Sequence, residues 1–170
     1  MSFSKDPLGH LGDLVAAAKT AGADAADAIY VEGISVSTAC RKGQPESLSR
    51  SEGYDLGLRV LIGQRQAIVS SSDLSKPALD DLVSRAVAMA RVVPEDPFCG
   101  LAPQDLLATD VPDLDSCDPV EPAGEVLEQR TAEAEEAALA IKGVTNSEGA
   151  EAGWGKSRLA VVGTNGFAQE

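Results

Sequence analysis

The chain has 170 residues, of which 44% are hydrophobic and 4% aromatic. This length fits one domain, or one domain and the start of a second, with a core built mainly from Ala, Val, Leu and Ile. The 14 basic and 27 acidic side chains give a formal net charge of -13, which disfavours binding to nucleic acids and to anionic membrane surfaces.

The cysteines and the first residues of the chain favour a location in the cytoplasm. Cys40, Cys99 and Cys117 are few, odd in number and far apart, which favours free thiols in a reducing environment over a disulfide framework. Met1–Pro7 lacks the basic and apolar segments of a secretory signal. No apolar run approaches the roughly 18 residues of a membrane-spanning helix. We therefore expect a cytoplasmic protein.

The first part of the chain predicts two helices. Asp6-Pro7 is a typical helix start, and apolar residues at helical spacing after it predict a helix over 7–21. A strong apolar stripe predicts another helix over 75–92, which Pro94 ends.

Between these helices, alternation with a period of two predicts strands. The expected strands cover residues 28–40, 45–50, 56–62 and 67–71. The expected turns between them are Lys42-Gly43, Glu52-Gly53 and Gly63-Gln64. Short turns that contain glycine favour an antiparallel meander.

Residues 94–121 have a different composition. They hold five prolines and eight acidic residues but no lysine or arginine, which is typical of a long ordered connection or an inter-domain linker. Four apolar side chains are expected to attach part of it to the core: Phe98, Leu101, Leu106 and Leu107.

A further helix is expected over about 122–142, with Val126, Leu127, Ala134, Ala137, Ala138 and Ile141 on its apolar face, followed by strands over 144–148 and 158–162. Thr164-Asn165-Gly166 is a hairpin turn signal that leaves only four residues for the returning strand. We therefore expect the N-terminal part of a longer protein, with a truncated second subdomain.

The whole pattern predicts an α+β fold. A mostly antiparallel meander sheet covered by helices is followed by a long acidic connection and a second helix–strand subdomain. The expected boundaries are 1–93 for the first domain, 94–121 for the connection and 122–170 for the second subdomain.

No complete catalytic, cofactor or metal site is expected in this chain. His10 is the only histidine and lies far in sequence from the cysteines, which argues against Cys–His catalysis and against a zinc site of paired ligands. An acidic ladder in the connection lacks the glycine and the closing glutamate of a calcium loop, so we expect it to be solvated. Its members are Asp110, Asp113, Asp115 and Asp118.

The other polar and glycine-rich clusters favour structural interpretations. Ser70–Asp73 offers no base to activate a serine and is expected to join a strand end to a helix cap. Glu133, Glu135 and Glu136 are expected to form a solvated helix face. The glycines at 53, 57 and 63 do not form a dinucleotide-binding loop. Trp154 is expected to anchor a loop over an edge of the core.

Several short motifs follow one another in an order and spacing typical of one family. They are Gly33–Thr38, Gly57–Val60 with Gly63 and Ala67, Ser70–Ser75, Pro94–Pro97 with Gly100-Leu101, Pro112–Asp115 and Thr145–Gly149. Through these motifs the chain, over about residues 23–168, resembles the N-terminal region of the TldD/PmbA family. The resemblance is closer to the PmbA branch, also called TldE.

The resemblance implies cytoplasmic proteins with an N-terminal α/β region and a larger, strand-rich C-terminal region. In the TldD branch it implies a zinc metallopeptidase with an HExxxH-type helix and a cysteine ligand. The PmbA branch pairs with TldD and generally lacks these ligands. The pair degrades or matures small, largely unfolded peptides. The family is also described as modulating DNA gyrase, through toxin and antitoxin peptides rather than DNA contact.

The corresponding helix in this chain reads Glu128–Glu133 without histidine, so no catalytic residue is carried over. We expect a non-catalytic subunit that binds extended peptides by strand addition, with a TldD-like partner carrying the zinc or with self-association. One alternative is a binding or assembly module unrelated to proteolysis. Another is an enzyme whose site lies wholly beyond residue 170, so intrinsic activity stays open.

Overall fold

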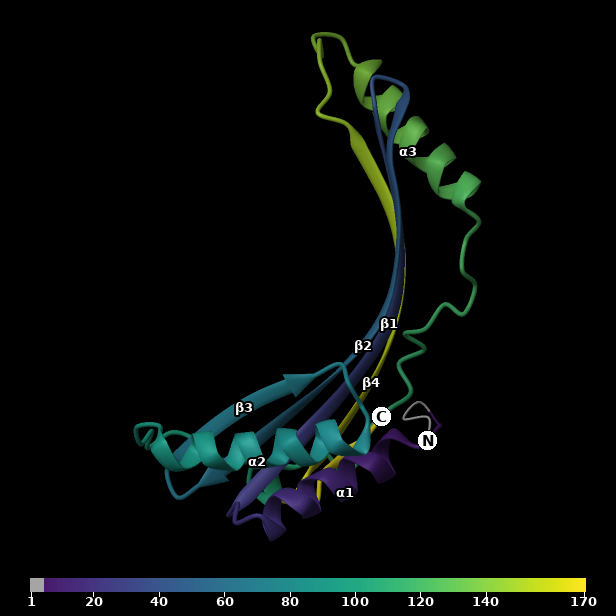
Figure 1. Cartoon of the computed structure of the whole chain (residues 1–170). Coiled ribbons are helices and arrows are strands. Elements are labelled where there is room, and N and C mark those ends of the chain that lie inside the picture. Colours follow the sequence, from purple (N-terminus) through teal and green to yellow (C-terminus); the bar gives the residue numbers. More distant parts are fainter. Residues whose placement is uncertain (1–4) are drawn as a thin grey trace. The chain divides into compact units, whose positions relative to one another are not determined.

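The computed structural model describes residues 5–170 as a five-stranded antiparallel sheet with three α-helices. The elements in chain order are α1 (Pro7–Thr20), β1 (Ala25–Arg41), β2 (Gln44–Ile62), β3 (Arg65–Ser71), α2 (Lys76–Val92), a short 3-10 helix (Gln104–Leu106), α3 (Gly124–Leu139), β4 (Ala150–Gly163) and β5 (Ala168–Gln169). The strand order is β3-β2-β1-β4-β5. Figure 1 labels the first four of these strands. The predicted α+β class with a mostly antiparallel sheet is confirmed.

Two compact units share the long strands of this sheet. The first contains the described residues up to Glu32, Tyr54–Pro112 and Arg158–Glu170, and the second contains Gly33–Gly53 and Asp113–Ser157. β1, β2 and β4 therefore contribute to both units. The two units divide the chain at other positions than the expected domain boundaries at 93 and 121. These boundaries stay a prediction.

In the first unit, α1 and α2 pack on the sheet (Figure 1). The core is aliphatic, as the composition predicted, and its largest fully buried members are Leu11, Leu56, Leu58 and Leu82 together with Tyr30. The Asp6 carboxylate caps α1 by accepting a hydrogen bond from the Gly9 N–H at 3.0 Å. Both helices begin and end within one residue of the predicted positions.

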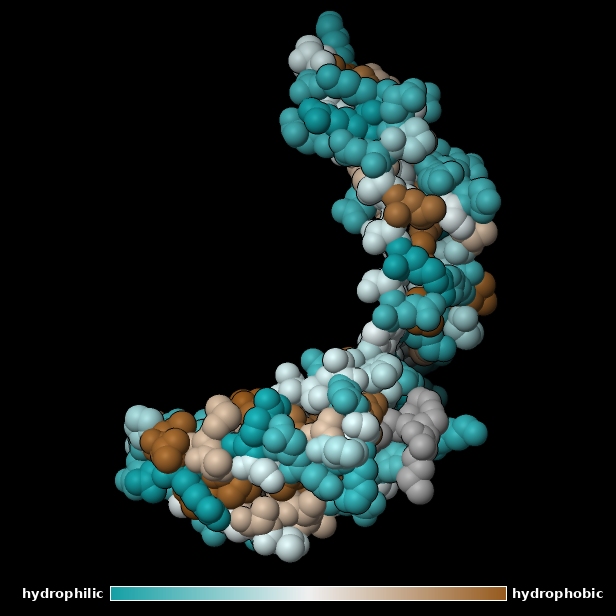
Figure 2. All heavy atoms as spheres, in the orientation of Figure 1, coloured by the Kyte–Doolittle hydropathy of each residue, from teal (hydrophilic) through white to brown (hydrophobic). Residues whose placement is uncertain are grey.

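In the second unit, α3 packs on the strands through a narrow, partly polar face. Leu127, Thr131 and Glu135, spaced by four residues, are its buried members. Val126 and Ile141, which were expected on the apolar face, are 40% and 63% exposed. Figure 2 shows hydrophilic side chains over most of the visible face of this unit, with a few apolar patches between them.

The expected turn at Glu52-Gly53 is wrong, because β2 runs unbroken from Gln44 to Ile62. Residues 44–55 are all exposed, so this half of the strand shows no alternation of burial that sequence patterning could detect. The turns at Lys42-Gly43 and Gly63-Gln64 are confirmed, since the strands end and begin on either side of them.

The C-terminal strands differ from expectation at their start. Residues 144–148 form no strand, and β4 begins instead at Ala150. The hairpin turn is confirmed: the Gly163 N–H bonds to the Phe167 carbonyl at 2.8 Å, and Gly166 has φ 93°. β5 pairs with Val161 and Val162 only.

The segment from Pro94 to Glu121 contains one short 3-10 turn and is otherwise without helix or strand. Phe98 and Leu106 are 94% and 72% exposed, so they do not attach it to the core as expected. Leu101 and Leu107 are half-buried and line a small cavity in the first unit. None of the helices described in residues 5–170 has the length and apolar character needed to cross a membrane.

Candidate functional site

The outer edge of β2 is open over its first twelve residues. β3 lies on that side of β2, and its pairing runs only from Leu56 opposite Ser71 to Ile62 opposite Arg65. Residues 44–55 extend beyond this pairing and are fully in the exposed class. An extended, unpaired strand edge presents a row of backbone donors and acceptors to a further strand.

The turn before β2 decides which backbone groups face this edge. Lys42 and Gly43 both have positive φ, 53° and 71°, as in the two-residue turn of a tight hairpin. In such a hairpin the residues flanking the turn pair with each other and alternate residues point their backbone groups away. Pro45, Ser47 and Ser49 therefore direct their backbone groups to the open edge, and Pro45 offers no donor there.

A cavity of about 510 Å³ lies between the start of β2 and the flank of α3. Its size is in the range of sites that hold a side chain or small ligand. Leu48 and Ala132 contribute apolar surface, while Glu46, Glu125 and Glu128 contribute carboxylates. The cavity thus adjoins the open edge, has a negative lining and contains no lysine or arginine among its lining residues.

Glu135 fixes α3 to the β1–β2 turn. Its carboxylate accepts hydrogen bonds from the backbone N–H groups of Lys42 and Gly43, each at 2.8 Å, and the Cys40 thiol lies 3.6 Å away. The Gly43 N–H, the Ser147 hydroxyl and the Lys42 N–H hold the pKa of Glu135 at about 2. The expectation that Glu135 belongs to a solvated face is wrong, since only 3% of it is exposed.

Two further contacts secure this part of the second unit. The hydroxyls of Thr38 and Thr131 share a hydrogen bond of 2.9 Å between β1 and α3, and both residues are buried. Arg50 of β2 pairs with Glu121, which leads into α3, and with Glu52 at 2.7 Å. The cavity beside the open edge therefore has walls held by specific polar contacts.

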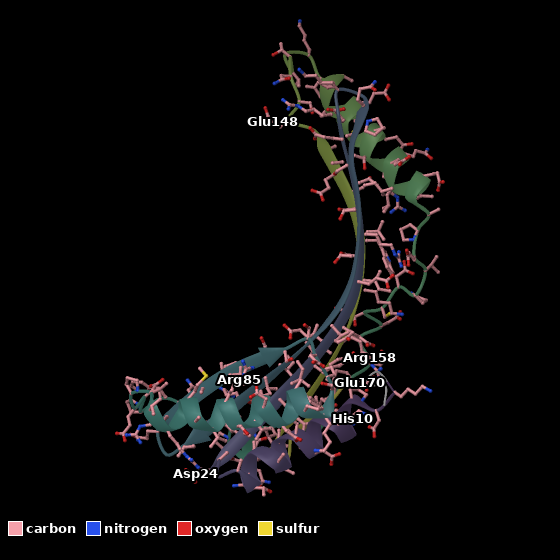
Figure 3. The ribbon with its side chains drawn as sticks, in the orientation of Figure 1. His10, Asp24, Arg85, Glu148, Arg158 and Glu170 are labelled. Carbon is pink, nitrogen blue, oxygen red and sulfur yellow. The ribbon has the colours of Figure 1, made fainter. Side chains whose placement is uncertain are left out.

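The sequence-derived candidates for chemistry are not brought together. Cys40 is buried, Cys99 is half-buried and Cys117 is exposed, and all three are free thiols. His10 lies on α1 and lines a different cavity in the first unit (Figure 3). Within residues 5–170, no group of three or more His, Cys, Asp or Glu side chains is arranged to hold a metal ion.

The other clusters have local structural roles. Ser71 and Asp73 bond across the strand end, and the Asp73 carboxylate accepts from the Ser75 N–H at 2.9 Å just before α2. The acidic ladder is exposed, and Asp113 accepts from the Asp115 N–H at 3.0 Å. Trp154 lies inside β4, so the expectation that it anchors a loop is wrong.

Comparison with known proteins identifies the family. Residues 26–90 match the family model described as PmbA/TldA metallopeptidase domain 1. The chain is 40% identical over 136 residues to "Metalloprotease PmbA" of Escherichia coli O157:H7. The chain belongs to the PmbA/TldD family. It is also 36% identical over 135 residues to "Metalloprotease PmbA homolog" of Haemophilus influenzae, which agrees with the closer resemblance to the PmbA branch.

The chain spans 30% of the length of each of these two PmbA relatives, while the matches cover 79% and 78% of the chain. Most of the sequence of each relative therefore has no counterpart in these 170 residues. The match places this chain in the PmbA/TldD family through a part of the PmbA sequence.

Solved structures share the fold at low sequence identity. A proposed modulator of DNA gyrase from Bacteroides thetaiotaomicron has a TM-score of 0.80 and 18% identity, with 99% of this chain and 39% of that chain covered. TldE from Thermococcus kodakarensis has a TM-score of 0.73 and 12% identity, with 94% and 36% covered. These similarities concern the architecture of the PmbA/TldD fold.

The family is named for a metallopeptidase, but the described residues do not fit a catalytic metal. A catalytic zinc needs about three protein ligands around an open position. No such donor set occurs in residues 5–170. The described residues therefore suggest no step of metal-assisted hydrolysis.

Proposed function

We propose that this chain is the N-terminal region of a PmbA-like (TldE-like) subunit in a metallopeptidase assembly. The assembly would act in the cytoplasm, degrading or maturing small unfolded peptides. A TldD-like partner would hold the zinc that activates water for amide hydrolysis. The PmbA names of the two relatives at 40% and 36% identity support this role, as does the open edge of β2.

The proposed contribution of this chain is to hold an extended peptide on the outer edge of β2. The carrying observation is that residues 44–55 extend beyond the pairing with β3. In strand addition, main-chain hydrogen bonds give affinity and neighbouring pockets select alternate side chains. Unfolded peptides suit this mode because their backbone groups are not engaged in structure of their own.

The subunit role is tested with the longer protein that contains this chain and a TldD-like protein from the same organism. We expect the two to co-purify and the pair to cleave an unstructured peptide faster than the partner alone. If the partner's cleavage rate is unchanged on adding this protein, the subunit role is rejected. A stable complex with a protein that is not a peptidase would instead favour a binding module unrelated to proteolysis.

The peptide site is tested separately with the 170-residue chain and a fluorescent, unstructured peptide. Ser49→Pro removes a backbone donor that faces the open edge, and Ser49→Thr is the matched control because threonine suits a strand. We expect the proline variant to weaken peptide binding about tenfold or more, and the threonine variant to bind as the original chain does.

A peptide N-methylated at alternate residues provides a test that does not depend on folding of a variant. It lacks the donors that an added strand needs, so we expect it to bind much more weakly than the unmodified peptide. Equal binding of the two peptides would exclude strand addition and leave the subunit role to be decided by the cleavage experiment.

A further inference from the structure

A second cavity, of about 710 Å³, lies within the first unit between α1, α2 and the strands β1 and β2. It shares no residue with the cavity beside α3, and Tyr54 is its one lining residue from the open stretch 44–55 of β2. Its volume is within the range of sites for small organic ligands.

Both tyrosines of the chain line this cavity. The rings of Tyr30 and Tyr54 lie with their centroids 6.4 Å apart and their planes inclined by 32°. Tyr30 is 1% exposed and Tyr54 is 50% exposed, so one ring is fixed in the core and the other is open to solvent. Aromatic faces attract ammonium and guanidinium groups through the negative charge of their π-systems.

Carboxylates outnumber cations around the cavity. Four acidic side chains line it (Asp13, Glu32, Asp73 and Asp80), against Lys76 as the one lysine or arginine among the lining residues. Lys76 is itself paired with Asp80 at 3.1 Å. Asp13 of α1 and Asp80 of α2 face the cavity from two different helices, which favours a positive ligand over a negative one.

The hydrogen-bond and ion-pair partners of Glu32 do not cancel the excess of acidic side chains around the cavity. The Tyr30 hydroxyl donates to Glu32 at 2.8 Å. Arg158, which does not line the cavity, approaches Glu32 at 3.6 Å and is closer to Glu170, at 2.5 Å (Figure 3). The Arg158 charge is therefore shared between two carboxylates.

Apolar side chains complete the walls, namely Leu14, Leu74, Leu79 and Val83. A small inorganic cation would gain nothing from them, whereas an alkyl or aryl group would be removed from water there. We propose that this cavity binds an organic cation in which an ammonium group is carried on an apolar body. This inference does not depend on the peptide-binding role of the second unit.

The test uses the tyrosine emission of the 170-residue chain carrying Trp154→Phe. The chain has two tyrosines and one tryptophan, so this change leaves the two cavity tyrosines as the emitting groups. The probes are hexylamine, which is charged at neutral pH, neutral hexanol and anionic hexanoate. We expect a saturable change with hexylamine, an apparent affinity about tenfold or more above that of hexanol, and no saturable change with hexanoate.

Two neighbouring residues of α2 provide a matched pair of variants. Asp80 lines the cavity and pairs with Lys76, whereas Asp81 does not line it and pairs with Arg85. Changing either aspartate to asparagine removes one ion pair with a residue four positions away on α2. We therefore expect the two changes to have similar effects on the free energy of unfolding. We expect Asp80→Asn to weaken hexylamine binding about threefold or more and Asp81→Asn to leave it unchanged.

Asp13→Asn on α1 and Tyr54→Leu extend the test to other walls, and each is expected to weaken hexylamine binding in a chain whose circular dichroism is unchanged. The proposal is overturned if hexylamine binds no more tightly than hexanol. It is also overturned if Asp80→Asn and Asp81→Asn alter binding equally, because the charge effect would then be general rather than local to the cavity.

Discussion

The carboxylate of Glu135 on α3 lies 2.8 Å from the backbone nitrogen of Gly43 and accepts its hydrogen bond. Gly43 is one of the two turn residues between β1 and β2, and its neighbour Lys42 donates to the same carboxylate. A single buried side chain thus joins the helix to the tip of the hairpin. Gly43 and Cys40, which both contact Glu135, line the cavity beside the open edge.

We expect Glu135→Gln to loosen α3 from the hairpin, because a neutral amide is a weaker acceptor and brings donors of its own toward the two N–H groups. Hydrogen exchange at Lys42 and Gly43 should accelerate clearly. Glu136→Gln, at the next and exposed position, is the control and should leave both amides as protected as before. Equal exchange in the two variants would show that Glu135 does not hold the turn.

The same carboxylate predicts acid sensitivity of the second unit. Its pKa is about 2 when folded, below its ordinary value of 4.5, chiefly because the Gly43 N–H bonds to the charged form. The folded state therefore binds fewer protons than the unfolded state between these values, so the stabilisation is complete above pH 4.5 and is lost as the pH falls toward 2. Trp154 fluorescence should follow this loss, and Glu135→Gln should flatten it.

The buried Tyr30 side chain predicts a loss of folding stability at alkaline pH. Burial, with a smaller effect of the hydrogen bond to Glu32, raises the pKa of Tyr30 from 10.0 to about 12. Because the folded state holds this proton more tightly, its stabilising effect is complete below pH 10 and is lost as the pH rises through 12. In a Tyr54→Phe chain, tyrosinate absorbance should appear near pH 12. Ionisation near pH 10 in the folded chain would contradict the buried placement.

Substitutions at two adjacent residues test which face of α3 packs on the strands. Leu127 is 1% exposed and Val126 is 40% exposed. Leu127→Ala should lower the free energy of unfolding by roughly 2–5 kcal/mol, as for other fully buried leucines. Val126→Ala should lower it by less than about 1 kcal/mol, since little apolar area is lost. Chemical unfolding followed by circular dichroism measures both, and the reverse order would mean that α3 packs through the other face.

The helices of the first unit could be predicted from the sequence because their apolar stripes and caps are strong local signals. The helix starts at Asp6-Pro7 and before Pro77 and the tight turns at Gly43 and Gly63 lie where expected. The length of β2 could not be predicted, since its first half is exposed on all sides and carries no periodic pattern.

On the buried face of α3, Leu127 was predicted, but Thr131 and Glu135 were missed for a related reason. The two polar residues are buried with hydrogen bonds to Thr38, Lys42 and Gly43, which lie about ninety positions away in the sequence. The Thr131 hydroxyl also donates to the Leu127 carbonyl of its own helix. Such long-range pairing leaves no local signature. The spacing of four between Leu127, Thr131 and Glu135 is the one feature that could have indicated a common face.

The cavity beside the open edge predicts a preference among peptides. Glu46, Glu125 and Glu128 line it without a cationic side chain, so a peptide strand on β2 that places lysine or arginine there gains attraction. We expect a lysine-containing unstructured peptide to bind more tightly than the same peptide with glutamate at that position. Because these acids are exposed, each of Glu46→Gln and Glu125→Gln should reduce the difference by only about two- to fivefold, in line with ion pairs at surfaces.

Glu151→Gln is the matched control, because Glu151 is an exposed acid in β4 of the same unit but does not line the cavity. It changes the net charge by the same amount as the two test variants, so an effect of overall charge would appear in all three. A preference for lysine that falls only in Glu46→Gln and Glu125→Gln places the basic side chain between β2 and α3. A preference that falls equally in all three variants, or that is absent, would mean that the cavity does not select the peptide.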